Sequence, residues 1–433
     1  MKKIFGVILM SIMLLGLCAC EKPQKPAQNA TFMAGFGRAK ITPDYSVPLA
    51  GYGNTTQRMS EGSLTFIYTS CIAVTDANGQ SILMYTNDHV CTSELTLDDL
   101  RSAISEATGV PGNRIMISAT HTHSGPDVRE VITAQHPYYT FFKNAMVEAG
   151  TQAMNDRSAA VMYSGSTTVE GLNFVRHYKM SDGKIAGDNF GDMQNATPVE
   201  SVHKADNEVQ IIRFARSAED KKDIVMMNFQ AHPKLASTAS TAYGRQNRKQ
   251  LTSDFVGPTT EYVEKTADVW CAYYQGAAGN LNPLDSYISR NNTTAQKSIF
   301  DYGKVLGGAV VDALPTLTEA TVTPTIKSKQ LQFEGKTPNG SVRPMEIDAF
   351  CIGDVGFVTA PFEMFDNTGM DIKAASPFET TIIMTYANGR SGYLPSEEVW
   401  DYGAYELTIC YYKRGTAEDV AQELVSMLKS LKG

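Results

Sequence analysis

The segment that most constrains this chain is RIMISATHTHSGP, residues 114–126, in which an apolar run leads into two histidines and a Gly-Pro break. The run is typical of a buried strand. Successive side chains of a strand alternate between its faces, so His121 and His123 are expected to point the same way. Two imidazoles that converge at the end of a core strand can bind a metal, or a metal and a substrate. A strand end with two hydrogen-bonded histidines would give the same pattern, so further residues must decide.

The N-terminal residues 1–19 have the pattern of a bacterial lipoprotein signal peptide. Lys2 and Lys3 precede an apolar stretch over 4–17, and the sequence LCAC over 17–20 places small residues before Cys20. We expect cleavage before Cys20, lipid on its thiol, and an anchor in the outer membrane, because the residues that follow are Glu21 and Lys22. A plain secretory signal is the alternative. Residues 20–31 are expected to form a flexible tether and 32–433 the folded domain.

Composition narrows the class of protein. The chain has 433 residues, of which 42% are hydrophobic and 19% charged, as expected of a globular protein. The net charge of −8 argues against a nucleic-acid partner and against electrostatic attachment to anionic membranes. Membrane contact is therefore expected through the lipid alone, and no protein partner is evident. The five cysteines after Cys20 form no CxxC pair, so we expect free thiols.

Apolar periodicity predicts strands and helices in alternation. Strands are expected over 66–74, 81–86, 115–118, 209–214, 224–229, 325–333, 346–352 and 356–359. Helices are expected over 94–108, 138–155, 255–266, 296–314 and from 415 onward, with an exposed loop over 336–344. This order predicts an α/β fold with a layered, mixed β-sheet core flanked by helices.

Three further segments place a polar residue near a Gly or Pro where a strand ends or a turn follows. They are QAHP, which contains His232; TAPFE, which ends at Glu363; and ANGRSGY, which ends at Tyr393. Active-site residues of α/β proteins collect where strands end and loops begin. Each segment alone also has an ordinary explanation, as a strand cap, a helix start or a core tyrosine.

Taken in order, these segments resemble the neutral ceramidases, which are zinc amidases acting on the N-acyl bond of sphingolipids. The matching stretches are THTHSGP at 120–126, AHP at 231–233, PFE at 361–363 and ANGRSGY at 387–393. Further similar stretches lie at 35–43, 51–52, 173–176 and 392–406, so the resemblance spans about 34–412. It implies a ceramidase-like catalytic domain over 32–433, with no counterpart in these residues for the C-terminal β-sandwich of the family.

The resemblance also implies roles for individual residues. Zinc would be held by His121, His232, Glu363 and Tyr393. Imidazole, carboxylate and phenol form a nitrogen and oxygen donor set that Zn²⁺ accepts. His123 would lie beside the metal and transfer a proton, while Arg176 and Tyr405 would contact the scissile amide.

One segment departs from the family pattern. In GNLNP at 279–283, Asn280 and Asn282 stand where the family has an aspartate and a serine that position the substrate head group. This favours a retained reaction on a different substrate. We expect zinc-dependent hydrolysis of the amide of ceramide or a related N-acyl lipid. The alternatives are a zinc hydrolase for another amide or ester, and a lipoprotein that binds a ligand without catalysis.

The remaining candidates are weaker. His89 follows a predicted strand and could support a ligand residue, and Asp254 could orient a ligand histidine. His136, His177 and His203 lie in polar loops or helix starts and are expected to be solvated.

Overall fold

The computed structural model describes residues 31–53, 57–129, 132–187, 196–285, 298–320 and 323–432. The predicted signal peptide, Cys20 and residues 20–30 of the predicted tether lie outside these ranges, so they stay predictions. No helix among the described residues is both long and apolar enough to span a bilayer.

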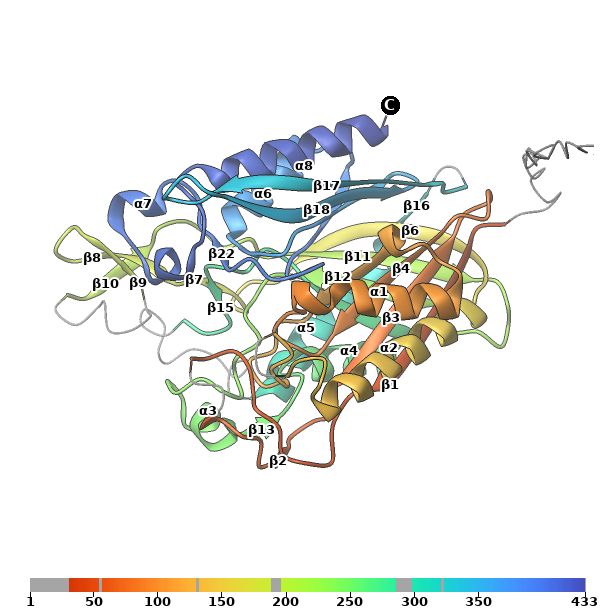
Figure 1. Cartoon of the computed structure of the whole chain (residues 1–433), viewed down its shortest axis with the longest axis horizontal. Coiled ribbons are helices and arrows are strands. Elements are labelled where there is room, and N and C mark those ends of the chain that lie inside the picture. The colour runs from red at the N-terminus through yellow and green to blue at the C-terminus, as the bar shows by residue number, and fades with distance from the viewer. Residues whose placement is uncertain are drawn as a thin grey trace, which may run out of the picture.

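The largest sheet of the described residues has nine strands and is mixed (Figure 1). Its order is β14-β12-β11-β6-β1-β3-β4-β5, and β16 also pairs with β6. The strands are β1 (Met33–Lys40), β3 (Tyr68–Thr75), β4 (Ser81–Asn87), β5 (Ile115–Ala119), β6 (Ser158–Thr168), β11 (Glu208–Arg216), β12 (Ile224–Phe229), β14 (Trp270–Gln275) and β16 (Thr318–Glu319). Two of its pairs, β4 with β5 and β12 with β14, are parallel.

Helices cover one face of this sheet. The helices α1 (Glu94–Thr108) and α2 (Pro137–Asn155) pack on the end formed by β1, β3, β4 and β5. The helices α4 (Val256–Ala267) and α5 (Ile299–Ala313) pack on the end formed by β11, β12 and β14. In β3, Cys71 and Ala73 face α1 and α2, whereas Ile72 and Val74 face the opposite side. This period of two lets both faces of the strand be buried.

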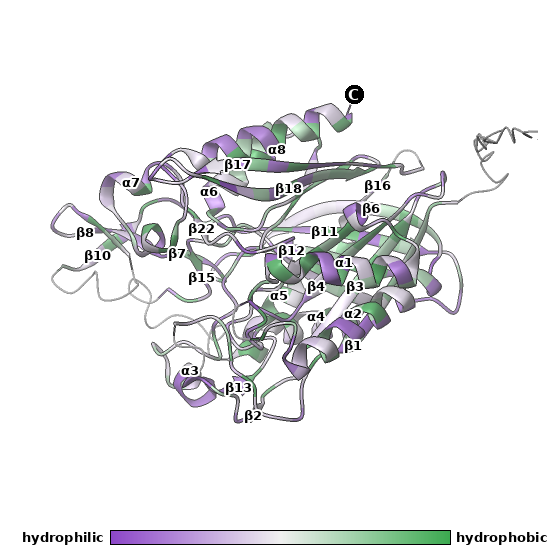
Figure 2. Cartoon of the chain, viewed as in Figure 1, coloured by the Kyte–Doolittle hydropathy of each residue, from purple (hydrophilic) through white to green (hydrophobic). Residues whose placement is uncertain are grey.

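A second sheet packs on that opposite face. It has the order β17-β18-β19-β21, with β17 (Ile326–Lys336), β18 (Val342–Ile352), β19 (Val355–Thr359) and β21 (Thr380–Met384). Phe350 and Phe357 of this sheet share a core with Ile72 and Met226 of the large sheet. The helices α6 (Asp366–Ala375) and α8 (Thr416–Lys432) cover its outer face, and α8 shows alternating polar and apolar bands (Figure 2). The result is helix, sheet, sheet, helix, which confirms the predicted layered α/β fold.

Short elements complete the described chain. Paired two-residue strands are β2 (Gly62–Ser63) with β13 (Gln250–Leu251), β7 (Phe174–Val175) with β15 (Leu281–Asn282), and β20 (Glu363–Met364) with β22 (Tyr393–Leu394). A small sheet contains β8 (His177–Met180), β9 (Ile185–Gly187) and β10 (Pro198–Ser201). The remaining helices are α3 (Ala242–Asn247), α7 (Val399–Tyr402) and the 3₁₀ turns η2 (Gly112–Arg114), η4 (Leu314–Thr316) and η5 (Tyr405–Ile409).

Local sequence signals placed most of the long elements correctly. Helix α1 has the predicted bounds, with the Ser93 hydroxyl accepting from the Leu95 N–H and Gly109 in the left-handed conformation. The expected loop over 336–344 is partly wrong, because Lys336 belongs to β17, and Val342, Arg343 and Pro344 belong to β18. The cysteines Cys71, Cys91, Cys271, Cys351 and Cys410 are free thiols, as predicted.

Candidate metal centre

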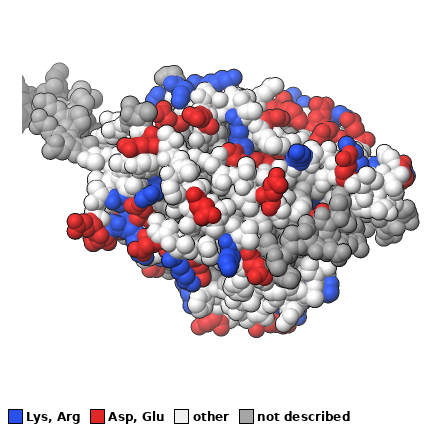
Figure 3. Space-filling model, turned by 180° about the vertical axis from the view of Figure 1, so that it is seen from behind, with Lys and Arg blue, Asp and Glu red and all other residues white. Residues whose placement is uncertain are grey.

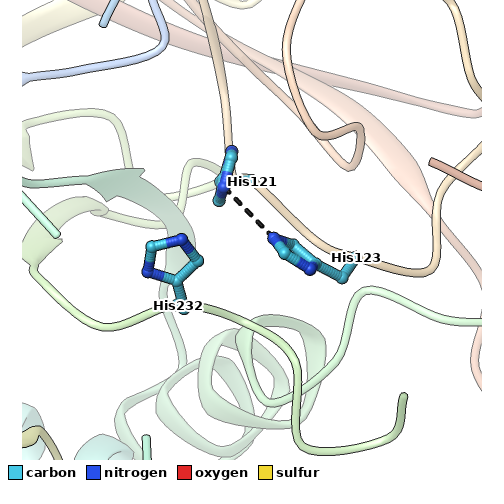
Figure 4. Close-up of side chains that lie close together, drawn as sticks. All are labelled: His121, His123 and His232. Atoms are coloured by element: carbon cyan, nitrogen blue, oxygen red, sulfur yellow. Dashed lines mark hydrogen bonds between the residues drawn. The ribbon is translucent and has the colours of Figure 1, made fainter. Parts of the chain in front are cut away.

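Three histidines lie close together just after strands β5 and β12 end (Figure 4). His121 and His123 follow β5, and His232 follows β12. One nitrogen from each ring lies within 4.8 Å of the others, and all three residues are buried. The Nε2 atoms of His121 and His123 are 3.2 Å apart. The predicted convergence of His121 and His123 therefore occurs, and the ring of His232 lies beside them.

The backbone reason for this convergence differs from the expected one. Strand β5 ends at Ala119, so alternation along a strand does not set the two side chains. Instead His121 adopts a left-handed conformation with φ of 66°. A non-glycine residue is uncommon there, and such residues cluster at functional sites.

Hydrogen bonds determine which ring nitrogens can bind a metal. His121 Nδ1 lies 2.7 Å from the Val90 carbonyl oxygen, and His232 Nδ1 lies 3.0 Å from that of Leu281. A carbonyl oxygen only accepts, so both Nδ1 atoms donate and carry hydrogen. In the neutral rings, each Nε2 then presents a lone pair to the centre. Backbone carbonyls commonly hold metal-binding histidines in this way.

Glu363 adds a carboxylate to the same point. Its Oε2 lies 3.3 Å from His232 Nε2 and 3.5 Å from His121 Nε2. Lone pairs and a carboxylate that face one another repel unless a proton or a cation lies between them. The donors present therefore fit a divalent cation such as Zn²⁺, which accepts nitrogen and oxygen ligands.

The electrostatics agree with this arrangement. Burial lowers the pKa of His232 to about 3. Burial and the neighbouring histidines hold the pKa of His123 well below its usual range. Burial raises the pKa of the Glu363 carboxyl, but His121 and His232 outweigh it and leave the pKa well below the usual value. Neutral rings and an ionised carboxylate are the forms that bind a metal.

Tyr393 is placed beside Glu363 by the pairing of two short strands. Strands β20 and β22 run parallel, and Glu363 and Tyr393 are partners in their register. Burial and the Glu363 carboxylate raise the pKa of Tyr393 well above 10. The predicted ligands His121, His232, Glu363 and Tyr393 thus lie together, although their binding of zinc stays a prediction.

Arg176 lies behind Tyr393. It is 2% exposed, and its Nη2 donates to the Tyr393 hydroxyl at 3.1 Å and to the Gly279 carbonyl at 2.6 Å. Its Nε donates to Glu406 Oε1 at 2.6 Å. Arg176 does not line the cavity described below, so its position favours holding Tyr393 over the predicted contact with the scissile amide.

A cavity of about 550 Å³ opens over the centre. His121, His123, Glu363 and Tyr393 line it. Tyr405 lines it too, as a residue that contacts substrate would.

Asn280 and Asn282 are not brought to this cavity. Asn280 is fully buried, and its side chain donates to Asp366 Oδ1 at 2.6 Å and accepts from the Asp366 N–H at 2.9 Å. Asn282 is 2% exposed and belongs to β15. An aspartate at 280 would place two carboxylates against each other, so the asparagine matches its neighbour Asp366. Substrate contact by these two residues stays untested.

No family model matches the chain. Solved structures do resemble it. One is the neutral ceramidase from Pseudomonas aeruginosa, with a TM-score of 0.73 at 15% identity, covering 93% of this chain and 75% of that one. Another is a ceramidase complexed with C2, with a TM-score of 0.71 at 15% identity, covering 93% of this chain and 76% of that one. The chain has the fold of a neutral ceramidase.

The expectation that His177 and His203 are solvated is wrong. His177 is 1% exposed, not solvated, and its Nε2 lies 3.1 Å from Glu406 Oε2. His203 is half-buried beside Asp366, at 2.9 Å. His136, by contrast, is at a helix start and only half-buried, and its side chain accepts from the Tyr138 N–H. Polar neighbours in sequence did not reveal these contacts, because the partners of His177 and His203 are more than 160 residues away.

Two proposed supporting residues act elsewhere. His89 Nε2 lies 2.9 Å from the Tyr138 hydroxyl, against α2. Asp254 accepts the backbone N–H groups of Leu235 and Ala236, at 3.1 and 2.8 Å, so it fixes the turn after His232 and not the ring. A residue without a predicted role, Tyr386, stacks on His121 with ring centroids 3.8 Å apart.

Proposed function

We propose that this chain is a zinc-dependent amidohydrolase that cleaves the N-acyl amide bond of ceramide or a related N-acyl lipid. The observation that carries the proposal is the convergence of the Nε2 atoms of His121 and His232 on Glu363 beneath a cavity. The ceramidase fold supports the same reaction class. Zn²⁺ bound there would supply a Lewis acid and lower the pKa of a bound water toward neutrality.

The residues of the chain position the reactants. His121 and His232 are fixed by the Val90 and Leu281 carbonyls, so their lone pairs need no reorientation. The amide carbonyl would lie in the cavity above them. Tyr405, on the cavity wall, is placed to donate a hydrogen bond to the oxyanion that forms as water attacks.

His123 is the residue best placed to move the proton. Its Nδ1 has no hydrogen-bond partner among the described residues, and its Nε2 faces His121. In the reaction the oxygen of water bonds to the acyl carbon and the carbon–nitrogen bond breaks. A proton from that water passes through His123 to the leaving nitrogen. The products are a fatty acid and an amine.

Arg176 acts through Tyr393 in this proposal. Glu406 Oε1 holds the Arg176 guanidinium, and Arg176 holds the Tyr393 hydroxyl. His177 contacts the other oxygen of the same carboxylate. These buried contacts would hold the phenol of Tyr393 in place to bind a metal.

The experiment is a hydrolysis screen of the purified folded domain. Ceramide, N-acyl amino acids and fatty esters would be incubated with and without zinc, and released fatty acid measured. We expect zinc-dependent release of fatty acid from amides. His232→Ala should abolish this release. His136→Ala is the matched control and should retain it, because His136 contacts the start of α2 and not the candidate centre. Release from esters alone would identify a different hydrolase. No release and no bound zinc would favour the ligand-binding alternative.

We also propose that lipid on Cys20 attaches the enzyme to the outer membrane. The support is the LCAC segment with its preceding apolar stretch. Such an anchor would keep the cavity near N-acyl lipids.

A further inference from the structure

The wall of the cavity is rich in arginine. Arg129, Arg248 and Arg390 line it, together with one carboxylate, Glu363. That carboxylate already faces the histidines. The three arginines come from segments far apart in the chain, so the fold and not a local basic run brings them together.

The arginines differ in how their charge is balanced. Arg129 Nε donates to Asp127 Oδ1 at 2.9 Å, so its charge is partly offset. Arg248 lies over the ring of Tyr52, 5.1 Å from the centroid, and forms no ion pair within the described part of the chain. Arg390 belongs to the turn that leads to Tyr393.

A fourth guanidinium stands behind Tyr52. Arg58 is 7% exposed, and its Nε and Nη1 have no hydrogen-bond partner in the described residues. Its Nη2 donates to the backbone oxygens of Ala50 and His123. Burial, together with the charges of Arg248 and Arg129, lowers the pKa of Arg58 to about 10. Asp127 raises the pKa of Arg58 only in part, and a buried cation whose charge is incompletely offset is stabilised when an anion approaches.

The exterior of the molecule contrasts with this wall. On the face shown in Figure 3, Lys and Arg side chains are interspersed with Asp and Glu. Arg213, for example, pairs with Asp223 at 2.5 Å. An excess of cations that is concentrated in one cavity raises the local concentration of anions there.

We infer that the substrate is an N-acyl compound whose amine half carries an acidic group, such as a carboxylate, sulfonate or phosphate. This inference rests on the proposed amidase function and names its substrate class. Guanidinium groups form paired, charge-assisted hydrogen bonds with such oxyanions. Ceramide, whose head group is neutral, would offer no oxyanion to this wall of guanidinium groups. Arg248 and Arg390 are the residues that would read the acidic group.

The test compares substrates of matched size. N-lauroylglycine and N-lauroylethanolamine share the acyl chain and differ in carboxylate against hydroxymethyl, and N-lauroyltaurine adds a sulfonate. We expect wild-type kcat/KM to be about tenfold or more higher for the acidic substrates. Arg248→Gln and Arg390→Gln should each reduce this ratio, because each variant should lower kcat/KM more for the acidic substrates than for the neutral one. Arg213→Gln, which removes a paired exterior arginine, should leave the ratio unchanged.

The possible outcomes separate the two proposals. Zinc-dependent hydrolysis with equal kcat/KM for acidic and neutral substrates overturns the acidic-substrate inference and leaves the amidase intact. If no amide is cleaved, the proposed function fails. The inference is then decided by calorimetric binding of N-lauroylglycine and N-lauroylethanolamine to the metal-free protein. The inference is supported if wild type binds N-lauroylglycine more tightly than N-lauroylethanolamine and the Arg248→Gln variant does not. Equal binding of the two compounds to wild type overturns the inference.

Discussion

At the scale of single residues, the candidate centre depends on which ring nitrogen of each histidine is free. The Val90 and Leu281 carbonyls fix the protons of His121 and His232 on Nδ1. His123 has no such bond, because its Nδ1 lacks a partner among the described residues. This difference is the basis for proposing His121 and His232 as metal ligands and His123 as the ring that exchanges a proton.

His232→Ala should therefore release the metal. Removing a ligand should lower metal affinity by more than the roughly 10–100-fold that loss of an outer hydrogen-bond partner causes. Elemental analysis of purified protein should find about one zinc per chain in wild type, as in a single four-ligand site, and little in the variant. Circular dichroism would confirm that the fold persists. Full retention of zinc in the variant would contradict the ligand assignment.

His123→Ala should keep the metal and lose turnover, because its ring lies beside the centre at 3.2 Å from His121. Bound zinc and kcat would be measured on the same preparation. The three histidines are also close enough to bind one ion jointly. If the substitution empties the site, all three rings are ligands and His123 is not the proton carrier.

Glu406→Gln tests the buried contacts behind Tyr393. Burial raises the pKa of Glu406, but Arg176 and His177 outweigh it and lower the pKa from 4.5 to about 2. Because the folded-state pKa is depressed, the carboxylate stabilises the fold above pH 4.5, by about 3 kcal/mol. This contribution is lost as the pH falls toward 2. In urea titrations of metal-free protein, the variant should be less stable at pH 7, and the gap should close below pH 4.5. A gap that is independent of pH would show that the ion pair is not its cause.

At the scale of elements, the β20–β22 ladder aligns two predicted ligands. The Gly392 carbonyl accepts from the Glu363 N–H at 2.9 Å, and Gly392 has φ of 70°. A Cβ there would meet the Ile409 carbonyl oxygen at 2.5 Å. The turn before Tyr393 therefore requires glycine for both its conformation and its space.

Gly392→Ala should weaken metal binding and lower stability by about 1–3 kcal/mol. Gly403→Ala is the matched control, since Gly403 has φ of 72° and nothing within 4 Å of its Cβ position. Melting temperature and zinc affinity would be compared for both. Equal zinc affinity in the two variants would mean that the ladder does not position Tyr393.

The elements that could be predicted are those with strong local signals. Strand β12 is a short apolar run and α1 has both caps, so both were placed correctly. Strand β6 was missed because its side chains are mostly half-buried or exposed and show no clean alternation. The spacing of two residues between His121 and His123 predicted that their side chains converge. The left-handed backbone of His121 has no local signature in the sequence.

At the scale of the whole molecule, the site is assembled from distant segments. The ordered set of matching segments predicted the residues around the centre, because family resemblance carries tertiary information that periodicity lacks. The contacts that close the site could not be predicted in this way. Tyr386 follows β21 of the second sheet and stacks on His121, which follows β5 of the large sheet. Arg129, Arg248 and Arg390 likewise reach one wall from three distant segments.

The proposed membrane attachment is also tested on the whole chain. Cys20→Ser should move the protein from the membrane fraction to the soluble fraction, because the lipid is its only proposed anchor. Activity on a soluble N-acyl substrate should stay unchanged. Fractionation with immunoblotting would measure the change, and unaltered membrane association would point to another anchor.

The most direct test of the account is a zinc titration of metal-stripped protein, with fatty-acid release from an N-acyl amide and bound zinc measured in each sample. For a zinc amidase, fatty-acid release should rise in proportion to bound zinc and saturate at about one ion per chain, with amine and fatty acid formed in equal amounts. Fatty-acid release that is unaffected by removal of the metal would contradict a zinc amidase. So would the absence of release from every amide tested when the zinc site is fully occupied.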